Sequence, residues 1–313
     1  MRADFGMPLA LGALEDDAHV LVIGNFDGVH LGHQALLAAA RRHADRAQGL
    51  VLAATFIPHP RIVLGGADPI PLLSPPEMRR RLLGALGVDR LLVLPFDEHL
   101  RSLEPDDFLN RLRSRYRLTA IVAGPRFSIG RGGSGRLSFL QSYCEQEGLA
   151  LEVVAPVLVG GREVSSSAIR QLLQEGRLEE AKVLLGHPFT ILGEVEHGEE
   201  RGRRLGFATA NLRWAEGQAL PPDGVYVMRA RAAGIELLPA VGSIGTRPQY
   251  GPGPRTLEVH CLQDPGSLYG QTLEVQILSR LRDQAVFGTE AELVAQISRD
   301  VEAAREYLLS LPG

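Results

Sequence analysis

The sequence predicts an α/β doubly wound parallel sheet followed by an antiparallel sheet or small barrel, and two observations carry that prediction. Up to about residue 186, short apolar runs alternate with amphipathic segments of helical periodicity, a pattern typical of a parallel sheet covered by helices on both faces. After Gly186-His187-Pro188, short apolar runs are separated by glycine and proline, and a long helical pattern returns only at the end. We therefore predict two domains, 1–186 and 187–313, in this chain of 313 residues.

The elements of the first domain follow from these runs. We expect strands at 20–23, 50–56, 90–96, 119–123 and 151–159, and helices at 34–46, 75–86, 105–116 and 137–147. The carboxyl ends of parallel strands share one edge of a sheet, and ligands bind outside that edge. The segments that follow these strands are therefore expected to come together.

The second domain is expected to contain mostly short strands. They are predicted at 191–195, 224–230, 235–241, 257–262 and 273–278, with an amphipathic helix at 291–309. A connection such as Ala233-Gly234 is typical of a hairpin, and hairpins indicate an antiparallel sheet or a small barrel.

Composition excludes several classes of function. The net charge is −4 and the arginines form no dense cluster, so we expect no nucleic-acid partner. The two cysteines, Cys144 and Cys261, form no disulfide framework, and no apolar run approaches membrane-spanning length. The N-terminus carries Asp4 and Glu15-Asp16-Asp17 and lacks the pattern of a signal peptide. We expect a cytoplasmic protein with no membrane partner, and a weak homo-oligomer is compatible with the sequence.

The run from Gly24 to His33, Gly-Asn-Phe-Asp-Gly-Val-His-Leu-Gly-His, is the segment most indicative of chemistry. It lies between a predicted strand and a predicted helix, where backbone N–H groups and the helix dipole attract an anion and glycines allow close approach. His30 and His33 are three residues apart, so both can face a phosphate from the first helical turn. The run predicts nucleotidyl transfer from ATP.

The run is also compatible with two other interpretations. A His-x-x-His pair can cap a helix or form half of a metal site, but a zinc site should offer further cysteine or histidine ligands at short spacing. A P-loop is disfavoured because the only lysine, Lys182, follows Glu-Glu-Ala rather than a glycine-rich loop. If ATP binds here, histidine, arginine and backbone amides must hold it.

Three further segments occupy comparable places in the first domain. Thr55 to Pro60, which contains His59, and Gly124 to Gly130, which contains Arg126, each follow a predicted strand. In Val164 to Arg170, the hydroxyls of Ser166 and Ser167 either cap a helix or join Arg170 in gripping a triphosphate or pyrophosphate.

The second domain offers two candidate constellations. The Gly- and Arg-rich run from His197 to Phe207, which includes Arg201 and Arg203, is either a solvated charged turn or a phosphate-binding loop. It leads into Thr209 and Asn211, which alternate along an extended segment and could serve a hard cation or phosphate oxygens. Period-two alternation places Glu258 with Thr256 and His260, opposite Leu257, Val259 and Cys261. By itself, Glu258 could equally be a solvated strand carboxylate.

These segments together closely resemble the bacterial bifunctional riboflavin kinase/FAD synthetase family, in which an FMN adenylyltransferase precedes a riboflavin kinase. The resemblance covers nearly the whole chain and includes several further runs. They are Pro222-Asp223-Gly224-Val225-Tyr226, Gly245-Thr246-Arg247-Pro248, Leu257 to Leu262 and Leu268-Tyr269-Gly270. The resemblance implies a nucleotidyltransferase-type first domain and a second domain that is a six-stranded antiparallel β-barrel with a terminal helix.

The resemblance also implies roles for individual residues of the kinase domain. Glu258 matches the catalytic base, Thr209 and Asn211 match the Mg²⁺-ATP ligands, and Arg201, Arg203 and Phe207 lie on the phosphate flap. Arg282 and Phe287 match the segment that closes over flavin.

In the adenylyltransferase domain, the resemblance assigns phosphate handling to His30, His33, Ser166, Ser167 and Arg170. Gly24, Asn25, Phe26 and Asp27 match the nucleotide-contacting turn, and His59 lies in a matching segment. The implied partners are riboflavin, FMN and ATP, with Mg²⁺ as cofactor and ATP as co-substrate.

One departure from the family pattern bears on function. Arg126, Ser128, Ile129 and Gly133 stand where the family has acidic or amide, basic, aromatic and basic residues. Either Arg126 replaces the missing guanidinium contacts to FMN, or the protein is a riboflavin kinase with a weakened or altered adenylyltransferase. A non-catalytic flavin or nucleotide sensor is a third alternative, which the joint presence of the catalytic groups disfavours.

Overall fold

The computed structural model describes residues 2–5, 15–65, 70–197, 206–234, 236–246 and 255–311. Arg201 and Arg203 lie outside the described residues. Contacts divide the chain into two compact units, one formed by Met1–Ile70 and Ser74–Ser166 and the other by Pro71–Leu73 and Ser167–Gly313. Within the described part of the chain, no helix is both long and apolar enough to cross a membrane.

The first unit contains a six-stranded sheet in which the described strands all pair in parallel. The strand order is β1-β4-β3-β2-β5-β6. The strands are β1 (Arg2–Phe5), β2 (Glu15–Ile23), β3 (Leu50–Ile57), β4 (Arg90–Pro95), β5 (Tyr116–Ala123) and β6 (Ala150–Val153). The chain runs outward from β2 through β3 to β4 and then returns to β5 on the other side of β2, so the order reverses between β2 and β5.

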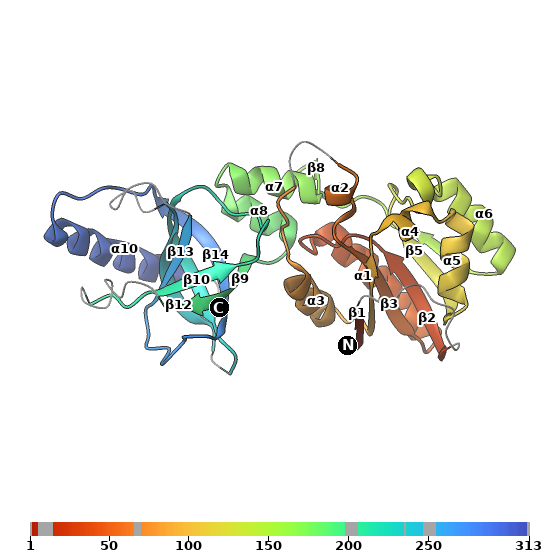
Figure 1. Cartoon of the computed structure of the whole chain (residues 1–313), viewed down its shortest axis with the longest axis horizontal. Helices are drawn as coiled ribbons and strands as arrows, with labels where there is room; N and C mark the ends of the chain where they lie inside the picture. The colour runs from red at the N-terminus through yellow and green to blue at the C-terminus, as the bar shows by residue number, and fades with distance from the viewer. Residues whose placement is uncertain are drawn as a thin grey trace. The chain divides into compact units, whose positions relative to one another are not determined.

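Helices cover both faces of this sheet, as predicted (Figure 1). They are α1 (Leu31–Arg46), α2 (Pro60–Val63), α3 (Pro76–Ala85), α4 (Glu98–Ser102), α5 (Pro105–Arg113) and α6 (Leu137–Glu147). A 3₁₀ turn (Arg131–Gly133) and a small hairpin of β7 (Leu158–Val159) and β8 (Arg162–Glu163) complete the unit.

Strand β2 shows why the sheet needs cover on both sides. Val20 and Val22 are buried in a core formed with α1 and α3, whereas Leu21 is buried in a second core formed with α5 and α6. Successive side chains of a strand point to opposite faces, so a continuous apolar run has to be covered on both.

Among the boundaries that differ from the prediction, two change the element to which a residue belongs. The helix predicted at 105–116 ends at Arg113, and Tyr116 instead begins β5, fully buried against the core of α5 and α6. The strand predicted at 151–159 is divided into β6 and β7, because the chain leaves the sheet after Val153 and β7 pairs with β8. Tyr116 is compatible with the end of a helix and with the start of a strand, and its packing partners decide between the two. The break after Val153 is likewise decided by strand pairing, which the local sequence does not show.

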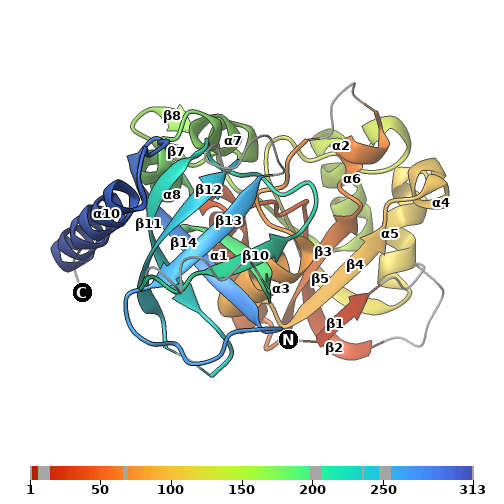
Figure 2. The ribbon, with the colours of Figure 1, turned by 60° about the vertical axis from the view of Figure 1, so that its left-hand side comes forward.

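The second unit is built on a closed barrel of six strands, with antiparallel pairing throughout and the order β10-β13-β12-β11-β14-β9 (Figure 2). The barrel confirms the expected architecture. Its strands are β9 (Phe189–Glu196), β10 (Ala210–Trp214), β11 (Gly224–Arg231), β12 (Leu238–Gly245), β13 (Thr256–Cys261) and β14 (Thr272–Arg282). The strand expected at 235–241 begins later, at Leu238.

Three helices accompany the barrel. They are α7 (Ser166–Gln174), α8 (Leu178–Leu185) and the terminal helix α10 (Glu290–Ser310). Helix α10 packs its buried Val301 and Ala304 against Val225, Val227 and Val241 on the outside of β11 and β12. Apart from Ser166, α7 belongs with α8 to the second compact unit, before the domain boundary predicted at residue 186.

Candidate active sites

The turn after β2 lies at the point where the strand order of the sheet reverses, which is where doubly wound proteins bind ligands. The backbone of the turn is unusual: φ is 48° at Phe26, 82° at Gly28 and 41° at Val29. Positive φ is rarely adopted by a β-branched residue such as Val29, and such conformations concentrate at functional sites. Phe26 and Val29 are fully buried, and this packing holds the turn in its shape.

The two predicted histidines are stacked on one another. His30 is the residue before α1 and His33 lies in its first turn, and their ring centroids are 3.7 Å apart with an interplanar angle of 17°. The Phe26 ring packs edge-on against His33. Gly32 leaves room for this arrangement, because a Cβ at this position would lie 3.2 Å from the His30 ring. The expectation that both imidazoles share one face is confirmed.

Burial is the main reason why the pKa of His33 lies well below its usual value, and electrostatic repulsion from the neighbouring His30 and Arg79 lowers it further. At neutral pH, His33 is therefore a neutral imidazole, since its charged form is disfavoured before an anion arrives.

The base of the turn is fastened by serine side chains. Asp27 is fully buried, and its carboxylate accepts hydrogen bonds from the Ser74 backbone N–H at 2.9 Å and from the Ser74 hydroxyl at 3.4 Å. The N–H of Gly28 donates to the Ser74 hydroxyl at 2.7 Å. Ser166, at the start of α7, donates to the carbonyl oxygen of Asp27 at 2.9 Å. Ser166 therefore supports the turn directly.

The segments after β3 and β5 lie on the same edge of the sheet as the turn, because all these strands are parallel. His59 is buried, and its Nδ1 accepts a hydrogen bond from the N–H of Arg61 at 3.2 Å. Arg126 is exposed and forms a two-pronged ion pair with Glu163 of β8, with N···O distances of 2.5 and 3.2 Å. Ile129, one of the residues that differ from the family pattern, is buried among the side chains of α5 and α6.

Two other predicted phosphate-handling residues lie in the second compact unit. Ser167 is exposed on α7. Arg170, one turn further along, is buried, and its Nε donates to the carbonyl oxygen of Pro71 at 2.7 Å.

In the barrel, strand register places three of the predicted kinase residues, Asn211, Glu258 and Arg282, in one row. Asn211 of β10 is paired with Glu258 of β13, and Glu258 is paired on its other side with Ser243 of β12. The row continues through Val225 of β11 to Arg282 of β14. Directly paired residues project from the same face of a sheet, so each side chain of the row lies beside the next one.

That row faces outward. Leu257 and Val259, on either side of Glu258, are buried in the barrel together with Leu212, the neighbour of Asn211. Glu258 and Asn211 themselves are half-buried. The predicted alternation along β13 is thus confirmed for Leu257 and Val259, whereas Cys261 is only half-buried, at the end of the strand.

The segment before β10 is joined to β13 by His260, whose Nδ1 lies 2.8 Å from the carbonyl oxygen of Ala208. Phe207 packs edge-on against the His260 ring and joins the apolar cluster beneath α10. Thr209 is half-buried, one residue before β10 begins. Phe207, the residue predicted to lie on a phosphate flap, is therefore close in sequence to the cation-ligand candidates Thr209 and Asn211.

Arg282 is held by a residue that the sequence analysis did not identify. Asp300 of α10 is 6% exposed and receives two hydrogen bonds from the Arg282 guanidinium, at 2.9 and 2.6 Å. Gln296 donates to the same carboxylate at 2.9 Å. The guanidinium carbon of Arg282 lies 6.0 Å from the centroid of the Phe287 ring. The ion pair thus ties the predicted flavin-closing segment to the terminal helix.

Asp300→Ala is expected to lower the free energy of unfolding of the second unit by about 2–4 kcal/mol, because it leaves the partly buried Arg282 charge without its partner. The measurement is the urea unfolding midpoint. Asp283→Ala removes an exposed carboxylate that pairs with Arg280 and should change the midpoint little. Equal stability of the two variants would contradict the role assigned to Asp300.

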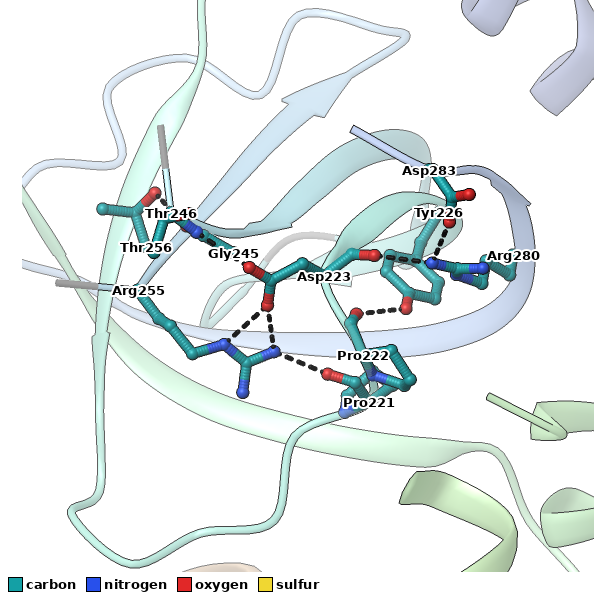
Figure 3. A network of polar contacts seen from close by, with 10 residues as sticks. All are labelled: Pro221, Pro222, Asp223, Tyr226, Gly245, Thr246, Arg255, Thr256, Arg280 and Asp283. Atoms are coloured by element: carbon teal, nitrogen blue, oxygen red, sulfur yellow. Dashed lines mark hydrogen bonds and ion pairs between the residues drawn. The ribbon is translucent and has the colours of Figure 1, made fainter. Parts of the chain in front are cut away.

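A second network centres on Asp223, immediately before β11 (Figure 3). Its carboxylate accepts hydrogen bonds from the N–H of Thr246 at 3.2 Å and from the Nε of Arg255 at 2.9 Å. Its carbonyl oxygen accepts from Arg280 at 2.6 Å. Gly245 has φ of 138°, and a Cβ there would lie 2.5 Å from the Asp223 carboxyl carbon. Asp223 therefore holds together the end of β12 and the start of β13, the strand that carries Glu258.

Ser74, Ser243, Asp223 and Asp300 were not selected as functional or supporting residues from the sequence. The run Pro222 to Tyr226 was identified as a motif, but nothing in it showed that Asp223 binds Arg255. The roles of these residues depend on hydrogen bonds or strand pairing with residues distant in the sequence, and local sequence patterns do not show such contacts.

A doubly wound α/β unit followed by a closed antiparallel barrel is the architecture expected of a two-domain nucleotide-dependent enzyme, and comparison with known proteins specifies its class. A family model described as FAD synthetase matches residues 13–168, and one described as riboflavin kinase matches residues 185–308. The chain therefore belongs to the bifunctional riboflavin kinase/FMN adenylyltransferase family, and it is a transferase with these two activities.

Individual relatives agree. The bifunctional riboflavin kinase/FMN adenylyltransferase of Escherichia coli K12 is 37% identical over 92% of each chain. The protein of the same name from Bacillus subtilis 168 is 35% identical over 95% of each chain. A crystal structure of a Streptococcus pneumoniae protein described as a macrolide-efflux protein has a TM-score of 0.83 and 31% identity, covering 93% of this chain and 95% of that one.

Proposed function

We propose that FMN is adenylylated on the turn carrying His30 and His33, and that riboflavin is phosphorylated on the outer row of the barrel. The observation that carries the second assignment is the register that sets Glu258 directly between Asn211 and Ser243. For the first, it is the stacked histidine pair at the point where the strand order reverses.

In the first reaction the FMN phosphate attacks the α-phosphorus of ATP, and pyrophosphate leaves. The nucleophile is already an anion, so the site needs donors rather than a strong base. His30 and His33 donate to phosphate oxygens as negative charge develops, helped by the N-terminal N–H groups of α1. Ser166 supports the turn through its hydrogen bond to the carbonyl oxygen of Asp27. The nucleotide contacts the backbone of residues 24–27 and the segment at His59.

In the second reaction Glu258 accepts the proton of the ribityl 5′-hydroxyl as that oxygen attacks the γ-phosphorus of ATP, the bond from this phosphorus to the bridging oxygen breaks, and ADP leaves. Phosphoryl transfer depends chiefly on positioning and on neutralising the charge of the phosphates. A half-buried carboxylate beside the attacking hydroxyl satisfies the first requirement. Arg282 and Phe287 close over the flavin, with Asp300 orienting the guanidinium.

Thr209 and Asn211 would hold the Mg²⁺ of Mg²⁺-ATP. A hydroxyl and an amide oxygen are hard ligands, and Mg²⁺ usually completes its coordination with substrate phosphates and water. When bound, the ion neutralises negative charge on the transferred phosphate. The register supports this placement because Asn211 lies directly opposite Glu258. We also propose a cytoplasmic location, where ATP is available for both reactions.

The decisive assay supplies purified protein with riboflavin, ATP and Mg²⁺ and resolves the products by chromatography. We expect FMN first and FAD after it. FMN alone would favour a kinase with a weakened adenylyltransferase, and binding without either product would favour a sensor.

Arg126 is the residue on which the FMN acceptor site depends in our proposal. Arg126→Ala should lower FAD formation from supplied FMN by roughly tenfold to a hundredfold, as expected when a charge-assisted contact to a phosphate is lost. Glu163→Gln keeps the guanidinium and removes only its ion-pair partner, so it should retain most activity. Unchanged FAD formation by Arg126→Ala would contradict this role.

The proposed domain boundary can be tested with two fragments. Residues 187–313 contain the whole barrel and should phosphorylate riboflavin. Residues 167–313 add α8, whose Leu178, Ala181, Leu184 and Leu185 are buried, and should unfold at a higher temperature because that apolar surface stays covered. Failure of both fragments to phosphorylate riboflavin while folded would show that the kinase site needs residues from the first domain.

A further inference from the structure

Arg79 is a buried cation that belongs to none of the sequence motifs. It lies in α3, and only 2% of its surface is exposed. Charged side chains are almost never fully buried unless they are paired or functional, so its position calls for a reason.

The guanidinium of Arg79 is connected to both sides of the phosphate-binding turn. Its Nη1 donates to the hydroxyl oxygen of Thr55 at 3.2 Å, and Thr55 in turn donates to the carbonyl oxygen of Asn25 at 3.2 Å. Its Nη2 donates to the carbonyl oxygen of Ser74 at 3.3 Å, the residue that binds Asp27 and Gly28. One intermediate residue thus links Arg79 to each end of the segment 25–28: Thr55 at one end and Ser74 at the other.

These contacts leave part of the guanidinium unused. Within the residues that the structure describes, the buried Nε of Arg79 has no hydrogen-bond partner, and neither has the buried Oδ1 of Asn25. A purely structural residue would be expected to satisfy its polar atoms, because each buried unsatisfied group costs stability. A preorganised ligand site requires polar groups that are held in place but still able to form hydrogen bonds, and the Nε of Arg79 and the Oδ1 of Asn25 are such groups beside the turn.

The charge of Arg79 also reaches the histidines. The charged groups acting on His33 are His30 and Arg79, and both lower its pKa. Asp27 is the charged group that favours the protonated form of Arg79, whereas burial lowers the pKa of Arg79. A guanidinium stays protonated in proteins, so a fixed positive charge acts on the His33 imidazole.

We propose that Arg79 is a positioning residue for nucleotidyl transfer, which holds the turn at residues 25–28 through Thr55 and Ser74 and supplies fixed positive charge beside the phosphate-binding histidines. The proposal rests on the function assigned above to His30 and His33. The charge attracts the triphosphate and stabilises the leaving pyrophosphate, and the two hydrogen bonds keep the turn in its strained conformation.

Three variants of the full chain separate charge from geometry. Arg79→Lys keeps the charge, Arg79→Gln keeps a donor without the charge, and Arg79→Met keeps only the length. FAD formation is followed with FMN and ATP supplied directly, and riboflavin phosphorylation by the same sample reports on the second unit. We expect kcat/KM for FAD formation to fall at least about tenfold in the Gln and Met variants and only about threefold in Lys, a difference typical of electrostatic preorganisation. Kinase activity should not change in any variant.

A second readout detects the charge itself. The ring resonances of His33 in histidine-labelled protein, assigned with His33→Gln, give its pKa by NMR titration. We expect the pKa to rise in the Gln and Met variants and to stay low in Lys, because only Lys keeps a positive charge nearby.

Either of two results would overturn the proposal: full FAD formation in the Gln variant, or a loss in Lys as large as that in Gln. If Met does not fold, the comparison of Lys with Gln still decides. Absence of FAD formation by the unaltered protein would instead refute the proposed function, so the two failures are distinguishable.

Discussion

Glu258→Gln is expected to lower riboflavin phosphorylation by on the order of a hundredfold or more, the loss typical of a positioned general base. Gln has nearly the same shape as Glu but does not accept the proton of the attacking hydroxyl. Because Glu258 lies on the outer face of β13 and not in the barrel core, the fold and most flavin binding should persist. The measurement is FMN formation from riboflavin and ATP, resolved by chromatography.

A matched control comes from the same barrel. Glu194 of β9 is exposed and pairs with Arg213, so Glu194→Gln should leave FMN formation near normal. FAD formation from supplied FMN should be unchanged in both variants. Near-normal FMN formation by folded Glu258→Gln would remove this residue from the catalytic role.

His30→Ala should nearly abolish FAD formation while riboflavin phosphorylation continues. Each donor to a developing charge is worth roughly 3 kcal/mol, so the loss should be about a hundredfold. The substitution also removes the ring that stacks on His33 at 3.7 Å, and this gives a further reason for a large effect. The two rates are measured separately, one from FMN and one from riboflavin.

His99→Ala serves as the control for this second experiment. His99 is an exposed residue of α4 in the same compact unit, and its loss should affect neither rate. If both activities fell together in His30→Ala with the fold intact, the assumption of independent sites would be wrong.

The sequence alone was sufficient to predict most of the architecture. Alternation of apolar runs and amphipathic segments identified a parallel sheet with two covered faces, and β2 shows the reason, since Val20 and Leu21 need separate cores. The order of motifs after strands placed the histidine turn at the correct edge of the sheet. Period-two spacing along β13 predicted that Glu258 would face away from Leu257 and Val259.

Some boundaries depended on contacts that local pattern does not contain. Tyr116 suits the end of a helix or the start of a strand, and its burial against α5 and α6 selected the strand. Residues Pro71–Leu73 lie in the first half of the sequence but belong to the second compact unit, where Leu72 pairs with Gln218. A pairing across so many residues leaves no local periodicity.

The partners of the residues that support the two sites likewise depend on tertiary structure. Arg79 is an ordinary helix residue in the sequence, and only folding places its guanidinium between Thr55 and Ser74. Asp300 occurs in a charged helix, where a solvated carboxylate would be expected, yet it is buried against Arg282. Local sequence determines which elements form and which face is apolar, because these depend on neighbouring residues. The partner of a buried charge depends on how distant elements pack, and this is settled only when the chain has folded.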